Sequence, residues 1–502
     1  MVLGKIKVKG QSIFKSKKEL NLTDGPVTKN LFYLSLPIIV MNLLQTAYNI
    51  ADTFWLGQLS DVALASITFA FPLVFFLISL GMGLSVAGSV LVAQFEGKGE
   101  RRKVDFAASQ TILFSLLASV ILGGFGYFFI GNIVSLMGAS PAAQAGATGY
   151  LQIISMGLFF MFGFFVFMSL MRGFGDTVTP MLLMFGSVVL NIILDPFLIF
   201  GWSIFPAMGV EGAAVATVFS RGLAMLVGLW ILFTGRKGVQ INLKQMYPDL
   251  SFFKKMLVIG VPASIEGTGR SVSVNLLVAV IGLTFAQTVV SGYGIAVRIF
   301  SLIFLPATAV GKGVETMTGQ NLGAGNEERA EAASNAGAKY TFAILTAIGV
   351  VTFAFAYPIA SIFTKSPEVA AVAAEFLRYV SFSFGFIGVL RSYTGSFRGA
   401  GATITAAIIS VGTLGGIRLP VAYFGAQSLG TIGVWIAFFA SNTIGAIIAY
   451  LWYRRGAWKG KELTEEEREK GEVAEDVEEF GDTVTESITQ KIGNLMETLN
   501  PR

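Results

Sequence analysis

The chain has 502 residues, of which 54% are hydrophobic and only 13% are charged. This composition argues against a soluble enzyme and is typical of a protein that crosses a bilayer many times. The absence of cysteine and histidine excludes disulfides, thiolate metal sites and imidazole proton relays. The net charge of +5 is uneven, because residues 1–29 are basic and the tail after Gly456 is acidic. We expect the basic start to face a membrane surface and not nucleic acid.

Twelve apolar segments follow one another along the chain, and each is long enough to cross a bilayer, which takes roughly 20 residues. They predict an all-α polytopic membrane protein with twelve transmembrane helices. The chain has no GxxxxGK[ST] phosphate loop, so we expect no ATP hydrolysis. We also expect that the chain is not an enzyme. The expected helices cover residues 31–57, 63–94, 105–130, 142–170, 178–200, 209–234, 251–281, 286–318, 332–362, 368–396, 402–424 and 430–453.

Basic residues mark alternate ends of these segments. By the positive-inside rule, the loops that hold them face the cytoplasm, which predicts that both termini are cytoplasmic. We therefore expect a multi-pass protein of the plasma (cytoplasmic) membrane. Lys365 is an exception, since it lies in one of the opposite loops. The basic positions are Lys5 to Lys29, Arg101 to Lys103, Arg172, Arg236, Lys237, Lys244, Arg329, Arg398, Arg454 and Arg455.

The second half of the chain repeats short motifs of the first, mostly at a shift of 226 residues. Each half holds six spans, an even number, so both halves insert the same way up. We predict two six-helix lobes related by a pseudo-two-fold axis along the membrane normal. The matched motifs are Pro37 and Pro262, Gln94–Gly99 and Gln320–Gly325, Arg172–Gly175 and Arg398–Gly401, and Gly209–Gly212 and Gly430–Gly433.

The two repeated halves, the linker between them and the two ends divide the chain into five parts. The last part carries apolar residues at helical spacing from Val473 to Leu499, which predicts either an amphipathic helix or a solvated tail. The parts are a basic cytoplasmic N-terminus at residues 1–29, an N-lobe at 30–235, a cytoplasmic linker at 236–250, a C-lobe at 251–455 and an acidic cytoplasmic tail at 456–502.

The first apolar segment carries a polar face. Gln45, Tyr48 and Asp52 are three and four residues apart, so they lie on one side of a helix. Pro37 comes earlier in the same segment, where it predicts a helix bend. An ionisable residue at bilayer depth is costly and usually serves transport.

The fifth segment carries the second polar face, formed by Asn191 and Asp195. Pro196 cannot donate a backbone hydrogen bond, which predicts a kink beside them. We interpret the two faces as one cation or proton site. The alternative is two unrelated polar contacts within the helix bundle. The positions 226 residues after the two acids hold Val278 and Val421, so the ion chemistry is assigned to the N-lobe.

The second half has two acids of its own within apolar segments. Glu266 has Arg270 one turn away, and Glu315 has Lys312 three residues before it. We expect each acid to be neutralised by this basic residue of its own helix. The C-lobe is therefore expected to supply closure and the walls of a substrate cavity.

Several of these motifs together resemble the multidrug and toxic compound extrusion (MATE) family, in the branch that includes the DNA-damage-inducible protein F group. The resemblance covers roughly residues 25–455. It implies a twelve-helix, two-lobe antiporter that expels amphipathic, often cationic compounds. The motifs are Leu36–Pro37, Gln45–Asp52, Arg172–Thr177, Asn191–Pro196 and Gly209–Thr217.

The resemblance also implies roles for individual residues. Acids matching Asp52 and Asp195 carry the coupling H⁺ or Na⁺, with an asparagine matching Asn191, and the first helix bends at Pro37. Carboxylate, amide and hydroxyl oxygens are hard ligands suited to Na⁺, so Asp52, Asn191, Asp195 and Thr217 form a candidate sodium site. No organic cofactor is expected. The supporting polar groups of the cavity match Gln45, Tyr48, Tyr150 and Thr217.

Two other functions stay open. A lipid-linked precursor flippase of the same wider superfamily is the main alternative, and Arg298, Arg391 and Arg418 in C-lobe segments favour it. A membrane receptor or scaffold without transport is the other, although the repeat and the buried acids argue against it. The expected partners are small organic cations or drugs and the lipid bilayer, and we expect a monomer.

Overall fold

The structure is a computed structural model that describes residues 7–8, 11–12, 14–137 and 140–459. In these residues the chain is helical apart from one short antiparallel ladder, β1 (Lys7–Val8) and β2 (Gln11–Ser12), before the first long helix. Most of the acidic tail, with its expected amphipathic helix, lies outside the described residues.

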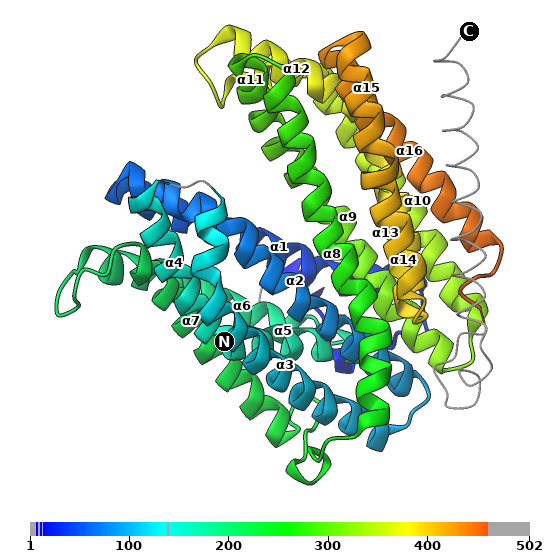
Figure 1. Ribbon diagram of the computed structural model, residues 1–502. Coiled ribbons are helices and arrows are strands. Elements are labelled where there is room, and N and C mark those ends of the chain that lie inside the picture. The colour runs from blue at the N-terminus through cyan, green and yellow to red at the C-terminus, as the bar shows by residue number, and fades with distance from the viewer. Residues whose placement is uncertain (1–6, 9–10, 13, 138–139, 460–502) are drawn as a thin grey trace, which may run out of the picture. The chain divides into compact units, whose positions relative to one another are not determined.

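The first half of the chain forms the N-lobe, drawn from blue to green in Figure 1. α5 packs against α2, α3 and α7, α2 also packs against α3, and α6 joins α7 to α1. A 3₁₀ turn, η2 (Lys17–Glu19), precedes them. The helices are α1 (Val27–Leu59), α2 (Asp61–Gly97), α3 (Arg101–Leu136), α4 (Pro141–Met156), α5 (Leu158–Phe174), α6 (Val178–Phe200) and α7 (Val210–Thr234).

The second half forms the C-lobe, in which α9 and α13 pack side by side and α10 and α16 cover α13. The segment η4 is a π-helix between α14 and α15. The elements are η3 (Leu243–Gln245), α8 (Leu250–Thr284), α9 (Gln287–Gly323), α10 (Glu327–Ala354), α11 (Ala356–Ser361), α12 (Pro367–Ser381), α13 (Phe384–Gly399), α14 (Thr403–Val411), η4 (Gly412–Arg418), α15 (Leu419–Leu429) and α16 (Thr431–Arg454).

Ten helices of the described chain are long and apolar enough to span a membrane, counting α14, η4 and α15 as one. Two further spans form if each bent helix pair is counted once, namely α4 with α5 at 56° and α12 with α13 at 55°. The total of up to twelve agrees with the all-α, twelve-helix fold that the sequence predicts. The two breaks themselves were not predicted.

The structure repeats itself where the sequence does. Both bent pairs begin at a Ser-Pro step, Ser140–Pro141 and Ser366–Pro367, where the serine hydroxyl accepts a hydrogen bond from the helix and proline occupies the first turn. Gly209 (φ 59°, ψ −132°) and Gly430 (φ 62°, ψ −139°) adopt the same backbone conformation, which side chains strongly disfavour. The motif pairs therefore mark equivalent turns in the two lobes.

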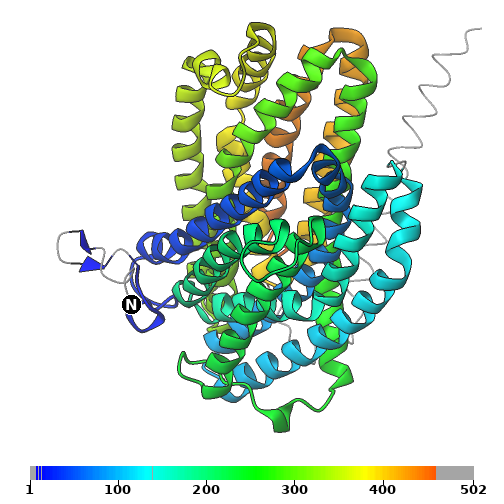
Figure 2. The same cartoon turned by 90° about the vertical axis from the view of Figure 1, so that its left-hand side faces the viewer.

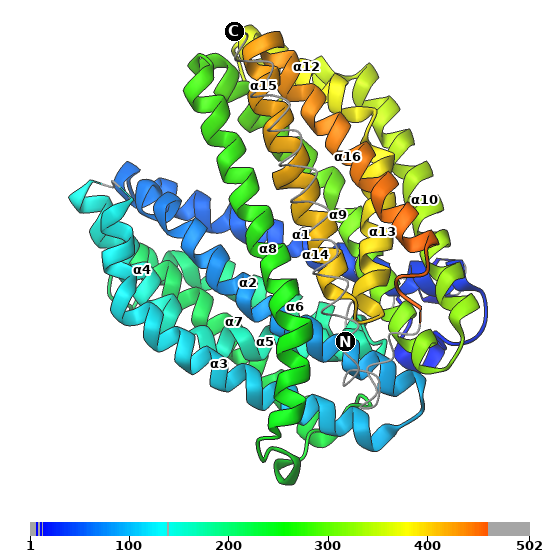
Figure 3. The same cartoon turned by 45° about the vertical axis from the view of Figure 1, so that its right-hand side comes forward.

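The two lobes meet along α2, which packs against α8 and α9 (Figure 3). At the end of α2 the contact is reciprocal. The Gln94 amide donates to the Gly399 carbonyl (3.2 Å), and the Gln320 amide donates to the Gly173 carbonyl (2.8 Å). These four residues are related by the 226-residue shift, so the interface resembles that of a two-fold dimer.

Close backbone approach makes this lobe interface possible. A Cβ atom on Gly97 would collide with the carbonyl of Gln320, and one on Gly323 would collide with the carbonyl of Gln94. Because the obstructing atoms belong to backbone, they cannot rotate away. We call this end of the molecule, where α2 and α9 end, the closed end.

Substituting Gly97 should separate the lobes at the closed end. Gly97→Val places a side chain against the Gln320 backbone, so we expect a new population with a longer distance between the lobes. Spin labels at Arg102→Cys and Glu328→Cys, both exposed, would report this distance by pulsed electron–electron double resonance. The chain has no native cysteine to interfere.

Gly124→Val is the matched control, because a Cβ atom there meets no atom within 4 Å. A distance distribution in Gly97→Val identical to that of the control would show that the glycine contact does not hold the lobes together.

Candidate functional site

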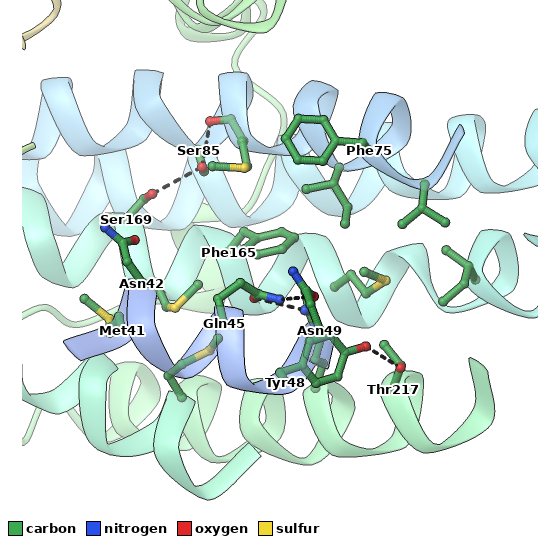
Figure 4. A pocket seen from close by; sticks show the side chains of 18 of the residues that line it. Met41, Asn42, Gln45, Tyr48, Asn49, Phe75, Ser85, Phe165, Ser169 and Thr217 are labelled. Carbon is green, nitrogen blue, oxygen red and sulfur yellow. Dashed lines mark hydrogen bonds between the residues drawn. The ribbon is translucent and has the colours of Figure 1, made fainter. Parts of the chain in front are cut away.

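A cavity of about 310 Å³ lies inside the N-lobe, between α1, α2, α4, α5 and α7. Its walls are mainly apolar, with phenylalanine and methionine side chains from α2 and α5 (Figure 4). One strip of α1 makes it polar. Positively charged side chains also line the cavity, one of them, Lys312, from the C-lobe helix α9. The polar lining groups are Asn42, Gln45, Tyr48, Asn49, Asp52, Ser85, Tyr150, Ser169, Arg172, Thr217, Arg221 and Lys312.

The two predicted acids meet where α1 packs against α6. Asp52 lines the cavity and is 4% exposed, while Asp195 lies behind it and is fully buried. The two carboxyl groups are close enough to influence each other electrostatically. The Asn191 side-chain amide donates to Asp195 Oδ1 (3.2 Å). The structure thus brings together the two polar faces that the sequence analysis singled out.

Three buried oxygens of this cluster face no donor group of the described protein. They are Asp52 Oδ1, Asp195 Oδ2 and Asn191 Oδ1. A buried polar atom without a partner costs about 1–3 kcal/mol, and more if it is charged. One proton shared between the carboxyls, or one cation held among the three oxygens, would remove this cost.

The donor set fits a proton or a hard monovalent cation. The described residues contain no group of three or more His, Cys, Asp or Glu side chains suited to a metal ion. A sodium ion at this place would therefore take amide and hydroxyl oxygens beside the two carboxylates. Thr217 is a candidate hydroxyl ligand in the wall of the same cavity.

Thr217 is tied to α1 through Tyr48. The Thr217 hydroxyl donates to the Ala213 carbonyl (2.9 Å), so it accepts the hydrogen bond of the Tyr48 hydroxyl (2.6 Å), as Figure 4 shows. Tyr150, 4% exposed, approaches the same hydroxyl from α4. The hydrogen bond between Tyr48 and Thr217 ties α1 to α7.

Arg221 is part of the cavity wall and was not predicted from the sequence. Its guanidinium donates to Gln45 Oε1 (3.2 Å) and lies over the rings of Tyr48 and Phe165, at 5.2 and 5.3 Å from their centroids. Gln45 in turn donates to Asn49 (3.1 Å). The available signal was a charge one turn after Thr217 in an apolar helix.

The two prolines lie within continuous helices. α1 runs through Pro37, and α6 runs through Pro196. α1 lies between α6 on one side and the C-lobe helices α9 and α10 on the other (Figure 2). Each proline leaves one carbonyl without its helical donor, so both helices contain a weak point. Bending at these points stays a prediction.

The expected pairing of the C-lobe acids within their own helices is wrong. In the described residues, Glu266 is held by Arg398 (3.0 Å) and Arg391 (3.7 Å), both from α13. Glu315 is held by Arg398 (3.0 Å) and by Arg172 of the N-lobe (3.6 Å). The planar Arg398 guanidinium reaches two carboxylates at once, which no residue on the acids' own helices does.

The model of the MatE family matches the chain twice, over residues 37–197 and residues 262–424. The chain belongs to the MatE family. The two matches start at Pro37 and Pro262, the first pair of the sequence repeat. Each lobe of this MATE transporter is therefore one copy of the family unit.

Relatives and solved structures agree with this assignment. The transporter is 29% identical over 447 residues to the probable multidrug resistance protein YpnP of Bacillus subtilis (strain 168), covering 89% of this chain and 99% of the relative. It is 28% identical to a multidrug resistance MATE family transporter of the MOP superfamily in an outward-facing conformation, with a TM-score of 0.83 and coverage of 89% and 99%. It is also 28% identical to a MATE in the bent conformation, with a TM-score of 0.83, and the match covers 90% of this chain and 100% of that one.

The contact between Tyr48 and Thr217 should appear as a coupling energy. Tyr48→Phe removes one partner of the buried Thr217 hydroxyl, and Thr217→Val removes the partner of the buried Tyr48 hydroxyl. Each variant should therefore lower the free energy of unfolding by about 1–3 kcal/mol. The double variant should lose clearly less than the sum, because the second change removes the orphaned partner. Thermal unfolding of the four proteins in one detergent measures this.

Thr53→Val is the control, since Thr53 is exposed and bonds only to the backbone of its own helix. Strict additivity of the Tyr48 and Thr217 variants would mean that the 2.6 Å contact contributes nothing.

Proposed function

We propose that this MATE transporter is a secondary active exporter that couples the entry of H⁺ or Na⁺ to the expulsion of amphipathic, mostly cationic organic compounds. The observation that carries the proposal is the buried pair Asp52 and Asp195, placed directly behind the wall of an apolar cavity. Two carboxylates this close in a low dielectric cannot both stay ionised without a partner.

The ion site and the substrate cavity share Asp52. When the pair is charged, the cavity presents the Asp52 carboxylate among aromatic and methionine side chains, and Arg172, Arg221 and Lys312 also line it. The carboxylate and the aromatic rings are the groups that would attract a soft organic cation. When H⁺ or Na⁺ neutralises the pair, this attraction is lost. The ion and the substrate therefore compete for the same charge, as an antiporter requires.

Bending of α1 would convert ion binding into motion. Pro37 is the weak point of α1, and the segment beyond it carries Gln45, Tyr48 and Asp52. Movement of this segment into the cavity would narrow it and displace the substrate. We also place this protein in the branch that includes the DNA-damage-inducible protein F group, on the strength of its Gln45–Asp52 and Asn191–Pro196 motifs.

The closed end would face the cytoplasm. The basic loops that the positive-inside rule assigns to the cytoplasm follow α2 and α5 and lie at this end. The conformation described here would then be open to the outside, where H⁺ or Na⁺ enters, and rocking of the lobes would alternate access. Both termini would be cytoplasmic, in the plasma membrane, and a single chain would contain the whole pathway.

A lipid-linked precursor flippase is the second candidate. Buried Arg391 and Arg418 favour it, because arginine suits the phosphates of such a lipid. The acid pair in the N-lobe favours the antiporter. A flippase would move a fluorescent lipid-linked phosphate between leaflets without needing an ion gradient.

Removing one carboxylate should uncouple export from the ion. In proteoliposomes with separate pH and Na⁺ gradients, Asp195→Asn and Asp52→Asn should lower gradient-driven export of ethidium at least tenfold. The asparagines keep size and polarity but cannot take up a proton or balance a cation. Dye efflux is followed by fluorescence.

Asp61→Asn is the matched control, because Asp61 is exposed at the start of α2. Export that keeps its full response to both gradients in the two site variants would rule out the proposed coupling role.

A further inference from the structure

A second cavity, of about 200 Å³, lies inside the C-lobe between α8, α9, α13, η4 and α16. Its charge is opposite to that of the acid pair in the N-lobe. Three arginines from three elements line it, namely Arg270, Arg391 and Arg418, and its aromatic walls come from Tyr293, Phe304 and Phe438. Exposed Val274 and Ser301 lie at its edge.

Each of these guanidinium groups lies over an aromatic ring of the cavity wall. Arg270 and Arg391 lie over the Phe304 ring, at 4.2 and 4.6 Å from its centroid, and Arg418 lies over the Phe438 ring at 4.3 Å. The N–H groups of a guanidinium lie in its plane. The Arg418 edge donates to Ser441 and Asn442, whereas Arg391 Nε has no hydrogen-bond partner among the described residues.

The positive charge of this region exceeds what its acids neutralise. Within the described part of the C-lobe interior, Glu266 and Glu315 are shared by Arg172, Arg391 and Arg398. Another acid of the lobe, Glu375, accepts hydrogen bonds from Trp435 and Thr431.

Among the described residues no salt bridge joins Arg270 or Arg418 to a carboxylate, and Arg391 has only a distant partner, Glu266 (3.7 Å). Charges at this depth are expensive unless they serve a bound ion or substrate.

Two further observations point to a ligand. Arg391 is 9% exposed, and its Nε has no hydrogen-bond partner among the described residues. Arg418 is oriented by Ser441 (2.9 Å) and Asn442 (2.7 Å) and closes the π-helix η4, an irregularity common at functional sites. Arg391 Nε is thus a buried donor without a partner in the described part of the chain, and Arg418 is held in place by its hydrogen bonds.

We propose that the C-lobe cavity binds the phosphate group of an amphipathic organophosphate. Several uncompensated arginines match a dianion better than a single carboxylate, and arginine pairs with phosphate through two parallel hydrogen bonds. The cavity is larger than one phosphate, and its aromatic walls accept an apolar group attached to it. The ligand is either a soluble organophosphate or the headgroup of a phospholipid.

Binding to the purified full-length transporter tests this without any transport assay, so it succeeds or fails independently of the antiport proposal. The probes are phenyl phosphate and dihexanoyl phosphatidic acid, with phenol as the uncharged comparison. We expect saturable binding of at least one phosphate probe to the wild type, measured by calorimetry in detergent, and none of phenol at the same concentration.

Variants locate the site. Arg270→Gln should weaken phosphate binding at least tenfold, and Arg391→Gln at least as much. Arg270 has no ion pair in the described structure, so its substitution should disturb folding less than that of Arg391, which pairs with Glu266. Arg378→Gln is the matched control, because it removes the same charge from an exposed position of the same lobe.

The two probes separate the sources of the ligand. Arginine-dependent binding of phenyl phosphate supports a soluble organophosphate, whereas arginine-dependent binding of phosphatidic acid alone supports a lipid headgroup. Binding of neither probe to the wild type overturns the proposal. So does binding that Arg270→Gln and Arg378→Gln weaken equally.

Discussion

The structure of the N-lobe depends on two carboxylates that share one buried place between α1 and α6. Asp52 and Asp195 have little access to water, and three oxygens of their cluster face no donor among the residues that the structure describes. In a low dielectric this arrangement is stable only with a proton or a cation present. Two other polar contacts of the cavity tie α1 to α7. They are the hydrogen bond between Tyr48 and Thr217 and the one between Gln45 and Arg221.

The two lobes share one backbone fold but bury side chains of opposite charge. Equivalent turns, equivalent bent helices and a reciprocal glutamine contact show that they are copies of one unit. The N-lobe buries an acid pair, whereas the C-lobe buries more arginines than its acids neutralise. Arg398 and Arg172 meet at Glu315, so an ion-pair network joins the lobes next to the glycine contact. Opening the closed end must break both.

The sequence predicted what depends on local pattern. Asp52 and Asp195 stood out because a charge in an apolar run is costly, and helical spacing placed their neighbours on the same faces. The 226-residue repeat predicted the two lobes. Partners of Arg398 and the place of Arg221 were missed, because they depend on helices far apart in the chain. The helix breaks near Gly157 and Ser383 were missed too, since neither position is a proline.

The central claim is that ion and substrate compete for the charge of one acid pair. The most direct measurement is ion release when tetraphenylphosphonium binds to the purified transporter, followed with a pH dye in weak buffer and with radioactive Na⁺. The account predicts that binding releases H⁺ or Na⁺ from the wild type and neither ion from Asp195→Asn. Substrate binding to the wild type that releases neither ion would contradict it.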